Sequence, residues 1–155
     1  MVNTNEAGKE FIQGMFTKDQ SFGEPCLIIE EPYPASAVAN EDSIVIKTSK
    51  EKFLNILKEF PEILLRFTQV FAKRIYNKSI IAKEIAIYNP EHRIFTILNL
   101  FKKNISENNR KKLKVEISRQ QIADMTGLRV ETVIRTIKTL QKKDKIKIEK
   151  GKIYM

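Results

Sequence analysis

The fold is decided by Ser118–Leu140, which reads SRQQIADMTGLRVETVIRTIKTL. Ser118 is a good helix N-cap, and Gln121, three residues later, completes the pattern of a capping box. Gly127 stands where the first helix must stop, because glycine adopts a left-handed C-terminal turn without steric cost. The stretch therefore predicts two short helices joined at Gly127, the pattern of a helix-turn-helix.

The second of these helices has one apolar face and one charged face. The apolar residues recur at helical spacing and are expected to face inward: Leu128, Val133, Ile137 and Leu140. The other face carries groups that bind DNA bases and phosphates: Arg129, Glu131, Thr132, Arg135 and Lys138. An ordinary helical hairpin with a solvated charged face is the competing interpretation.

Short strands are predicted on both sides of this motif. Residues 114–117 form one, and residues 145–148 and 152–155 alternate around Lys150-Gly151 as a β-hairpin, so the unit is predicted to be a winged helix. Residues 104–112 are polar and are predicted to form a loop. A preceding helix is predicted after Asn89-Pro90, with an apolar side formed by Ile94, Ile97, Leu98 and Phe101.

Charge is divided unevenly along the chain. The net charge is +9, but residues 93–155 hold 17 basic and 6 acidic residues, whereas residues 1–92 hold 11 basic and 13 acidic ones. A strongly basic segment beside a near-neutral one predicts a polyanionic partner, and nucleic acid is favoured. The alternative, a lysine-rich proteome, explains the number of lysines but not their separation.

The residue inventory narrows the class of protein. One cysteine and one histidine in 155 residues exclude a disulfide within the chain and a zinc or iron–sulfur site built by one chain. We find no glycine-rich phosphate loop, nucleophile elbow or paired carboxylates, so we expect no enzyme, metal or cofactor. Without a long apolar run or signal peptide, a cytoplasmic protein without membrane contact is expected.

The N-terminal part is predicted to form a small antiparallel sheet or barrel. Its strands are expected at residues 9–16, 26–30, 35–39 and 43–48, separated by glycines and prolines. Thr48 with Glu51 then predicts a capping box for a helix with an apolar side formed by Phe53, Leu54 and Leu57.

Pro61 opens a longer helix, predicted to run to about Tyr88, before Asn89-Pro90 interrupts it. Residues along it recur at alternating spacings of four and three, as in the seam of a coiled coil. A monomer would expose too much of this helix, so a parallel homodimer is predicted; packing of the whole stripe within one chain is the alternative. The seam consists of Phe60, Leu64, Phe67, Phe71, Arg74, Lys78, Ile81, Ile85 and Tyr88.

Together these features resemble the CRP/FNR family of bacterial transcription regulators, from about Phe11 onward. Phe22-Gly23-Glu24 is similar to the start of the family's phosphate-binding cassette, and Arg93 to an arginine that opens its DNA-binding domain. Residues 117–123 and 131–135 match its helix-turn-helix core. The resemblance implies an α+β fold: a partial antiparallel β-roll (1–59), a dimerisation helix (60–88) and a winged helix-turn-helix (89–155).

The resemblance also implies partners and roles. A homodimer would bind a palindromic site in double-stranded DNA, and RNA polymerase would be a further partner. Bases, in half-sites similar to the family's TGA core, would be read by Arg129, Glu131 and Arg135. Phosphates would be held by Ser118, Arg119, Gln120, Thr132, Lys138, Lys150 and Lys152.

Two departures argue against a cyclic-AMP sensor. Where nucleotide-binding relatives have an Arg-Ser pair, this chain has Pro34-Ala35-Ser36, and Lys78-Ser79 replaces Thr-Ser on the long helix. Glu24 and Arg74 survive and could form a structural salt bridge. The effector is thus unknown, and the pocket is vestigial, with remnants at Gly23, Glu24, Ser36, Arg74, Lys78 and Ser79.

A further departure from the family is length. The family's sensor domain has several more strands before Phe22 than this chain supplies, which predicts either a truncated form or a reduced β-roll. Both favour a DNA binder over a small-molecule sensor. Two rival hypotheses are a ligand-sensing module and a basic winged-helix protein that binds RNA or another protein.

Overall fold

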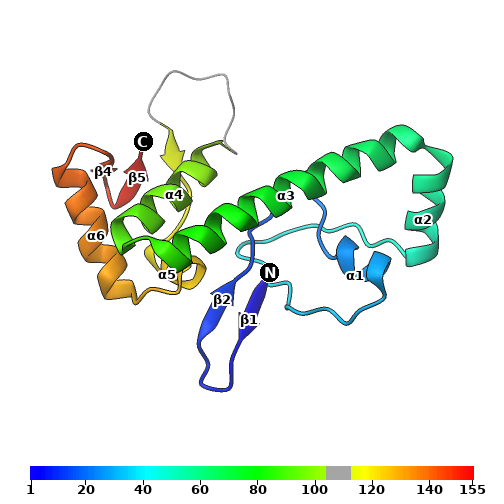
Figure 1. The fold of residues 1–155 in the computed structure, drawn as a ribbon, viewed down its shortest axis with the longest axis horizontal. Helices are drawn as coiled ribbons and strands as arrows, with labels where there is room; N and C mark the ends of the chain where they lie inside the picture. The colour runs from blue at the N-terminus through cyan, green and yellow to red at the C-terminus, as the bar shows by residue number, and fades with distance from the viewer. Residues whose placement is uncertain (104–112) are drawn as a thin grey trace. The chain divides into compact units, whose positions relative to one another are not determined.

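The structure, a computed structural model, describes residues 1–103 and 113–155. Its contacts divide the chain into two compact units, residues 1–75 and 76–155, so the division falls inside the long helix α3 (Pro61–Ile87) (Figure 1). The predicted loop at residues 104–112 lies outside the described residues. The α+β class is confirmed, since helices and small antiparallel sheets occur together.

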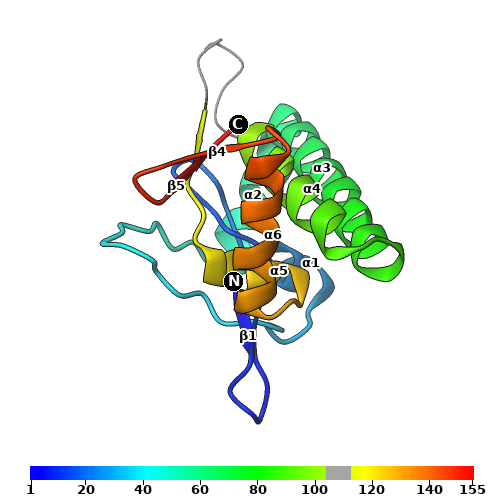
Figure 2. The same cartoon turned by 90° about the vertical axis from the view of Figure 1, so that its left-hand side faces the viewer.

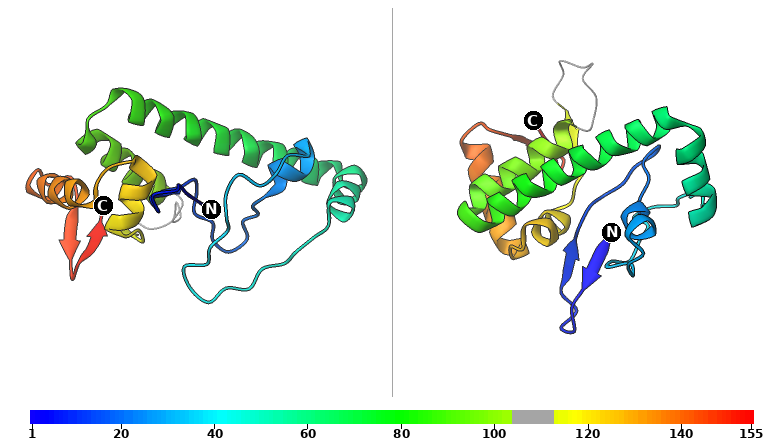
Figure 3. Two further views of the ribbon diagram at one scale, coloured as in Figure 1. Left: turned by 90° about the horizontal axis from the view of Figure 1, so that it is seen from below. Right: turned by 45° about the vertical axis from the view of Figure 1, so that its right-hand side comes forward.

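The second unit is a winged helix-turn-helix. Its helices are α4 (Pro90–Lys103), α5 (Arg119–Thr126) and α6 (Val130–Lys142). The strands β3 (Lys114–Val115), β4 (Lys147–Glu149) and β5 (Lys152–Tyr154) form one antiparallel sheet in the order β3-β5-β4. The β4–β5 hairpin projects from the helices (Figure 3, left). The predicted helices and hairpin are confirmed, with shorter strands than expected.

The second unit has a dense apolar core. Side chains from α4, α5, α6 and β5 meet there with 2% or less of their surface exposed, among them Ile94, Leu98, Ile122, Val133, Ile137, Leu140 and Ile153. Burial of this many aliphatic side chains is the dominant stabilising term for a small domain. The helical spacing in the sequence had placed most of these residues on inward faces.

Local signals at the helix-turn-helix act as predicted. The Ser118 hydroxyl accepts from the Gln121 backbone N–H at 3.0 Å, and the Gln121 side chain accepts from the Ser118 N–H at 2.9 Å. Gly127 ends α5 in the left-handed region, with φ 68°. Ala123 of α5 is buried with 2% exposure, and α5 packs against both α4 and α6.

The first unit contains less regular structure. The strands β1 (Val2–Thr4) and β2 (Glu10–Ile12) form a hairpin that projects from the rest of this unit (Figure 3, right). The helices α1 (Glu24–Ile29) and α2 (Lys50–Glu59) follow, and α3 begins at Pro61. Only the strand expected over residues 9–16 is confirmed, and only in its first half, at Glu10–Ile12.

The other predicted N-terminal strands are wrong. Residues 26–29 fall in α1 and Glu30 is its C-cap, because Gly23 adopts a left-handed φ of 89° and Pro25 occupies the first helical turn. Residues 35–39 contribute one bridge, between Ser36 and Val2, and residues 43–48 pair with no strand of the described chain. Ile44 and Ile46 are consequently 99% and 97% exposed. Alternating apolar residues form a strand only when a neighbour satisfies their backbone.

The helix α2 begins one residue later than predicted. Its N-cap is Ser49 rather than Thr48, and the Ser49 hydroxyl accepts from the Lys52 N–H. Phe53 and Leu57 are buried as expected, and the Phe53 ring packs edge-to-face on Phe67 of α3 at 5.2 Å. In the described part of the chain, no helix combines the length and apolarity needed to cross a membrane.

Candidate nucleic-acid interface

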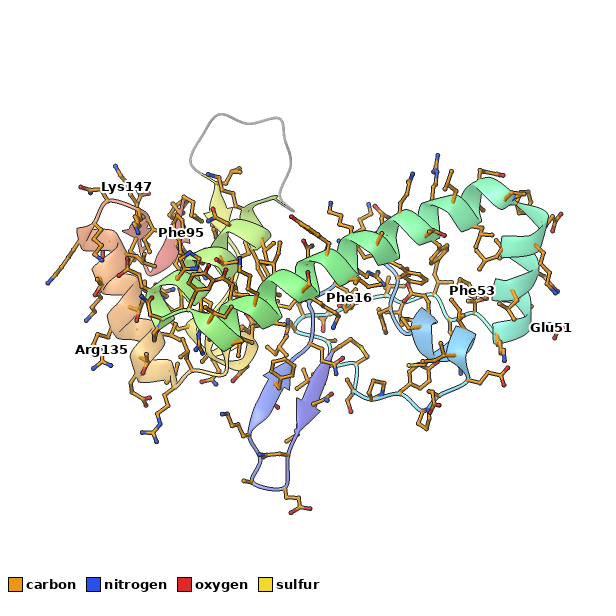
Figure 4. All side chains as sticks on the ribbon, in the orientation of Figure 1. Phe16, Glu51, Phe53, Phe95, Arg135 and Lys147 are labelled. Atoms are coloured by element: carbon orange, nitrogen blue, oxygen red, sulfur yellow. The ribbon has the colours of Figure 1, made fainter. Side chains whose placement is uncertain are left out.

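The exposed face of α6 carries the predicted base-reading side chains. Arg129 is the N-cap residue, and Glu131 and Arg135 lie on the exposed side. Figure 2 looks onto α6, and in Figure 4 Arg135 points away from the unit. The opposite side of α6 holds Val133 and Ile137 in the core with at most 1% exposure. Arg129, Glu131, Arg135 and Lys138 are all exposed, as a base-reading helix requires, and Thr132 is half-buried.

The predicted phosphate contacts at the start of α5 already have partners within the chain. Ser118 caps the helix, and the Gln120 amide donates to Asp124 at 2.9 Å. The Arg119 guanidinium donates to the backbone carbonyl of Gly151 at 2.6 Å. The start of α5 is thus joined to the turn between β4 and β5 by a hydrogen bond between residues 32 positions apart. The spacing of residues in the sequence did not reveal this contact.

The wing places its lysines in solvent. Glu149 and Lys152 are partners in the β4–β5 ladder, and Lys150 and Gly151 make the connecting turn. Both turn residues have positive φ, 46° and 75°, as a two-residue hairpin of this type demands. Lys150 and Lys152 are exposed, consistent with the predicted phosphate contacts.

A carboxylate on α4 contacts two lysines just past the C-terminal end of α6. Glu91 accepts from the Lys143 ammonium at 2.7 Å and from Lys145 at 3.3 Å. The Lys143 hydrogen bond, despite the opposing desolvation, lowers the pKa of Glu91 below its usual 4.5. Sequence reasoning missed this pairing because the partners are 52 residues apart.

The corner between α3 and α4 is tied by polar contacts. The Arg93 Nε donates to the Tyr88 carbonyl at 2.7 Å, and the Asn89 side chain accepts from the His92 backbone N–H at 3.1 Å. The His92 ring stacks on Tyr88 and bonds to the buried carboxylate of Glu84. These contacts give Arg93, singled out in the sequence, a structural role at the start of α4.

Part of the predicted dimer seam lies against its own chain. Phe67 contacts Phe53 and Phe71, and the Arg74 guanidinium lies 5.9 Å from the Phe71 ring. Arg74 also donates to Glu24 at 3.2 Å and to the Ser21 carbonyl at 2.6 Å. For Phe67, Phe71 and Arg74, the structure therefore agrees with the alternative interpretation, in which the stripe packs within one chain. Whether Leu64, Lys78, Ile81 and Ile85 contribute to a seam stays a prediction.

The residues of the predicted vestigial pocket fall in both units. In the first unit, Glu24 is 4% exposed and forms the salt bridge with Arg74, and a side chain at Gly23 would press on the Tyr33 ring. The Ser36 backbone pairs with Val2. In the second unit Lys78 and Ser79 are exposed, and the Ser79 hydroxyl donates to the Tyr76 carbonyl. Among the described residues, no group of three acidic, histidine or cysteine side chains could hold a metal ion.

Comparison with known proteins locates two domains. A family model described as "Cyclic nucleotide-binding domain" matches residues 1–60, and one described as "Crp-like helix-turn-helix domain" matches residues 93–155. The cAMP-activated global transcriptional regulator CRP of Haemophilus influenzae is 31% identical over 139 residues, which are 88% of this chain and 62% of that protein. The CRP of Pasteurella multocida is 30% identical, with coverages of 88% and 66%. The chain thus spans less than two thirds of the length of these relatives.

Solved structures share the fold. The c-di-GMP responsive global regulator CLP of Xanthomonas campestris aligns with a TM-score of 0.71 and 19% identity, covering 99% of this chain and 78% of that one. A putative transcriptional regulator of the CRP/FNR family from Eubacterium rectale aligns with a TM-score of 0.64 and 18% identity, covering 99% and 70%. The two domain models together match most of the chain, at residues 1–60 and 93–155. The chain therefore belongs to the CRP/FNR family.

Proposed function

We propose that this chain is a sequence-specific DNA-binding transcription regulator that acts as a homodimer without cyclic AMP. The single observation that carries the proposal is the solvent-facing side of α6. The opposite side of α6 is buried in the apolar core. Arg129, Glu131 and Arg135 are exposed to solvent on a unit rich in lysine. A helix supported in this way can enter the major groove without rearranging its own core.

The chemistry of these side chains suits a G·C-containing half-site. Arg135 can donate two hydrogen bonds to the O6 and N7 atoms of guanine, and Glu131 can accept from the amino group of cytosine. The wing lysines Lys150 and Lys152 supply a salt-dependent attraction to phosphates that does not depend on base sequence. Specificity would thus come from α6 and much of the affinity from lysine.

The dimer is proposed to form on the side of α3 that its own chain leaves bare. Four residues spaced by three, four and three line that side: Leu65, Thr68, Ala72 and Ile75. All four are exposed, Leu65 by 60% and Ile75 by 68%, and two of them are small enough for close approach of a second helix. This stripe replaces Phe67, Phe71 and Arg74 of the sequence-based seam. A two-fold axis there would present two α6 helices to successive major grooves, about 34 Å apart.

Independence from cyclic AMP is supported by the charges around Glu24. The Arg74 guanidinium is already satisfied by the Glu24 carboxylate and the Ser21 carbonyl. The residues of Pro34-Ala35-Ser36 supply no cation for a phosphate. A phosphate buried without a partner charge is costly, so a cyclic nucleotide would bind weakly here.

The proposed regulatory role includes a contact with RNA polymerase, as the family resemblance implies.

The experiment that tests DNA reading is a fluorescence-anisotropy titration at about 0.15 M salt, where nonspecific attraction is moderate. A palindrome with two TGA-containing half-sites is compared with its scrambled version, each with and without cyclic AMP. We expect at least about a tenfold preference for the palindrome, unchanged by the nucleotide. Equal binding to both duplexes would reject sequence-specific reading. A preference that needs cyclic AMP would reject only the nucleotide independence.

The dimer is tested separately by light scattering. We expect twice the 18.0 kDa chain mass for the parent protein and a monomer for Ala72→Glu, since two carboxylates would meet at the axis. Lys73→Glu changes the charge of the neighbouring exposed position and should leave the mass unchanged. A dimer that persists in Ala72→Glu would place the interface elsewhere.

A further inference from the structure

The turn of the wing contains a residue that is unfavourable for its conformation. Lys150 has a φ of 46°, in the left-handed region where the Cβ atom crowds the following carbonyl group. Hairpins of two connecting residues favour asparagine, aspartate or glycine at this place. Gly151 fits the second position of the turn, but Lys150 does not fit the first.

Core packing and strand pairing hold only the base of the wing, at the end of the hairpin opposite to its turn. Ile153 is buried with 1% exposure, and β5 pairs with β3 through Val115 and Ile153. The tip lies at the far end of β4 and β5, each of which has three residues. In the described chain, the one side chain that hydrogen-bonds to the turn is Arg119, whose guanidinium donates to the Gly151 carbonyl at 2.6 Å.

We propose that Arg119 is a positioning residue that holds the wing turn against the start of α5, so that Lys150 can occupy the tip and meet a DNA phosphate. The inference rests on the proposed DNA-binding function. A lysine at the tip places a positive charge where the wing would meet the backbone of the duplex, at the expense of turn stability. The charge-assisted hydrogen bond from Arg119 offsets that loss. Arg119 thus acts through the wing lysines and is not itself a phosphate contact.

The test begins without DNA, with the full chain and nuclear magnetic resonance relaxation of backbone amides. In Arg119→Gln the amides of Lys150, Gly151 and Lys152 should become mobile on the nanosecond timescale, while the amides of α6 stay rigid. Lys150→Asn supplies a residue that tolerates the left-handed region. The double variant Arg119→Gln with Lys150→Asn should therefore recover a rigid turn. Amides at the turn that stay rigid in Arg119→Gln would overturn the proposal.

The second part measures how duplex affinity depends on salt, because each lost phosphate contact lowers the slope of log K against log salt by about 0.9. Lys150→Gln should lower the slope by that amount. Arg119→Gln should reduce affinity roughly tenfold, as for the loss of one hydrogen bond from a charged donor, with the slope unchanged. Arg66→Gln, which removes an exposed arginine of the first unit, is the matched control and should change neither quantity.

The outcomes separate the two proposals. If Arg119→Gln lowers the slope by about 0.9, Arg119 is a phosphate contact and the positioning role is rejected. If the parent chain binds no duplex at all, the proposed function fails, while the amide measurements still decide whether Arg119 holds the turn.

Discussion

The two units of this chain differ in how completely their apolar residues are buried. In the unit of residues 76–155, Ile94, Leu98 and Val133 have no exposed surface. In the unit of residues 1–75, the most buried aliphatic side chains, Leu57 and Ile12, keep 8% and 9%, while Ile44 and Ile46 are almost fully exposed. The comparison teaches that an apolar pattern yields a core only where its packing partners are present.

The largest expected effect is on stability of the cores. Leu98→Ala should lower the free energy of unfolding of the second unit by about 2–5 kcal/mol, since it leaves a cavity among fully buried side chains. Ile44→Ala should change stability by less than about 0.5 kcal/mol, as at any solvated site. Urea titrations monitored by nuclear magnetic resonance would report each unit. A large loss in Ile44→Ala would show that residues 43–48 are packed in solution.

The next effect concerns function in the well-packed unit. Arg135→Ala should weaken binding to the palindrome by about 1–3 kcal/mol and binding to scrambled DNA much less. Its matched control is Arg66→Ala, which removes an exposed arginine of the first unit and should leave binding to both duplexes unchanged. Anisotropy titrations with both duplexes measure the difference. Equal losses on both duplexes would remove Arg135 from base reading.

Helix caps provide a smaller contrast between the units. Ser118→Ala removes the bond of 3.0 Å from the Gln121 backbone N–H to the Ser118 hydroxyl and should destabilise the second unit by about 1 kcal/mol. Ser49→Ala removes one longer bond, of 3.3 Å, and should cost the first unit less than that. Urea midpoints of the two variants test the order. Equal losses would mean that the difference in length between the two capping bonds does not affect stability.

The smallest expected effect is a dependence on pH. Lys143 lowers the pKa of Glu91, and Lys50 lowers the pKa of Glu30, in each case from 4.5. A carboxylate with a lowered pKa in the folded state adds stability above its unfolded pKa, and this is lost as the pH falls through the folded value. Glu91→Gln should therefore lower the urea midpoint slightly at neutral pH and not at about pH 3.

The Glu30 carboxylate is exposed and the Glu91 carboxylate is half-buried at the surface, so salt should screen both effects. Glu30→Gln is the counterpart in the first unit, with the same direction expected there. A Glu91→Gln variant that is equally destabilised at acidic and neutral pH would show that the carboxylate matters for packing and not for charge.

The candidate site could be predicted from the sequence to the extent that its signals are local. The ends of α5 are defined by contacts between residues a few positions apart, at Ser118, Gln121 and Gly127. The exposed side of α6 follows from the helical spacing of its buried residues, Val133, Ile137 and Leu140. The N-terminal strands could not be predicted in this way. Alternation at residues 43–48 signals a strand, but a strand also needs hydrogen-bonding neighbours elsewhere in the chain.

The sequence by itself thus determined the two ends of α5, the winged helix-turn-helix and the separation of charge, because these follow from residues close together in the chain. Only the tertiary structure decided the long-range pairs. It joined Arg74 to Glu24 across 50 residues, Glu91 to Lys143 across 52 and Arg119 to Gly151 across 32. It also packed Phe67 between the chain's own Phe53 and Phe71 and left Leu65 and Ile75 exposed. Periodicity marks a helix as apolar on more than one side, but which side its own chain covers depends on what packs against it.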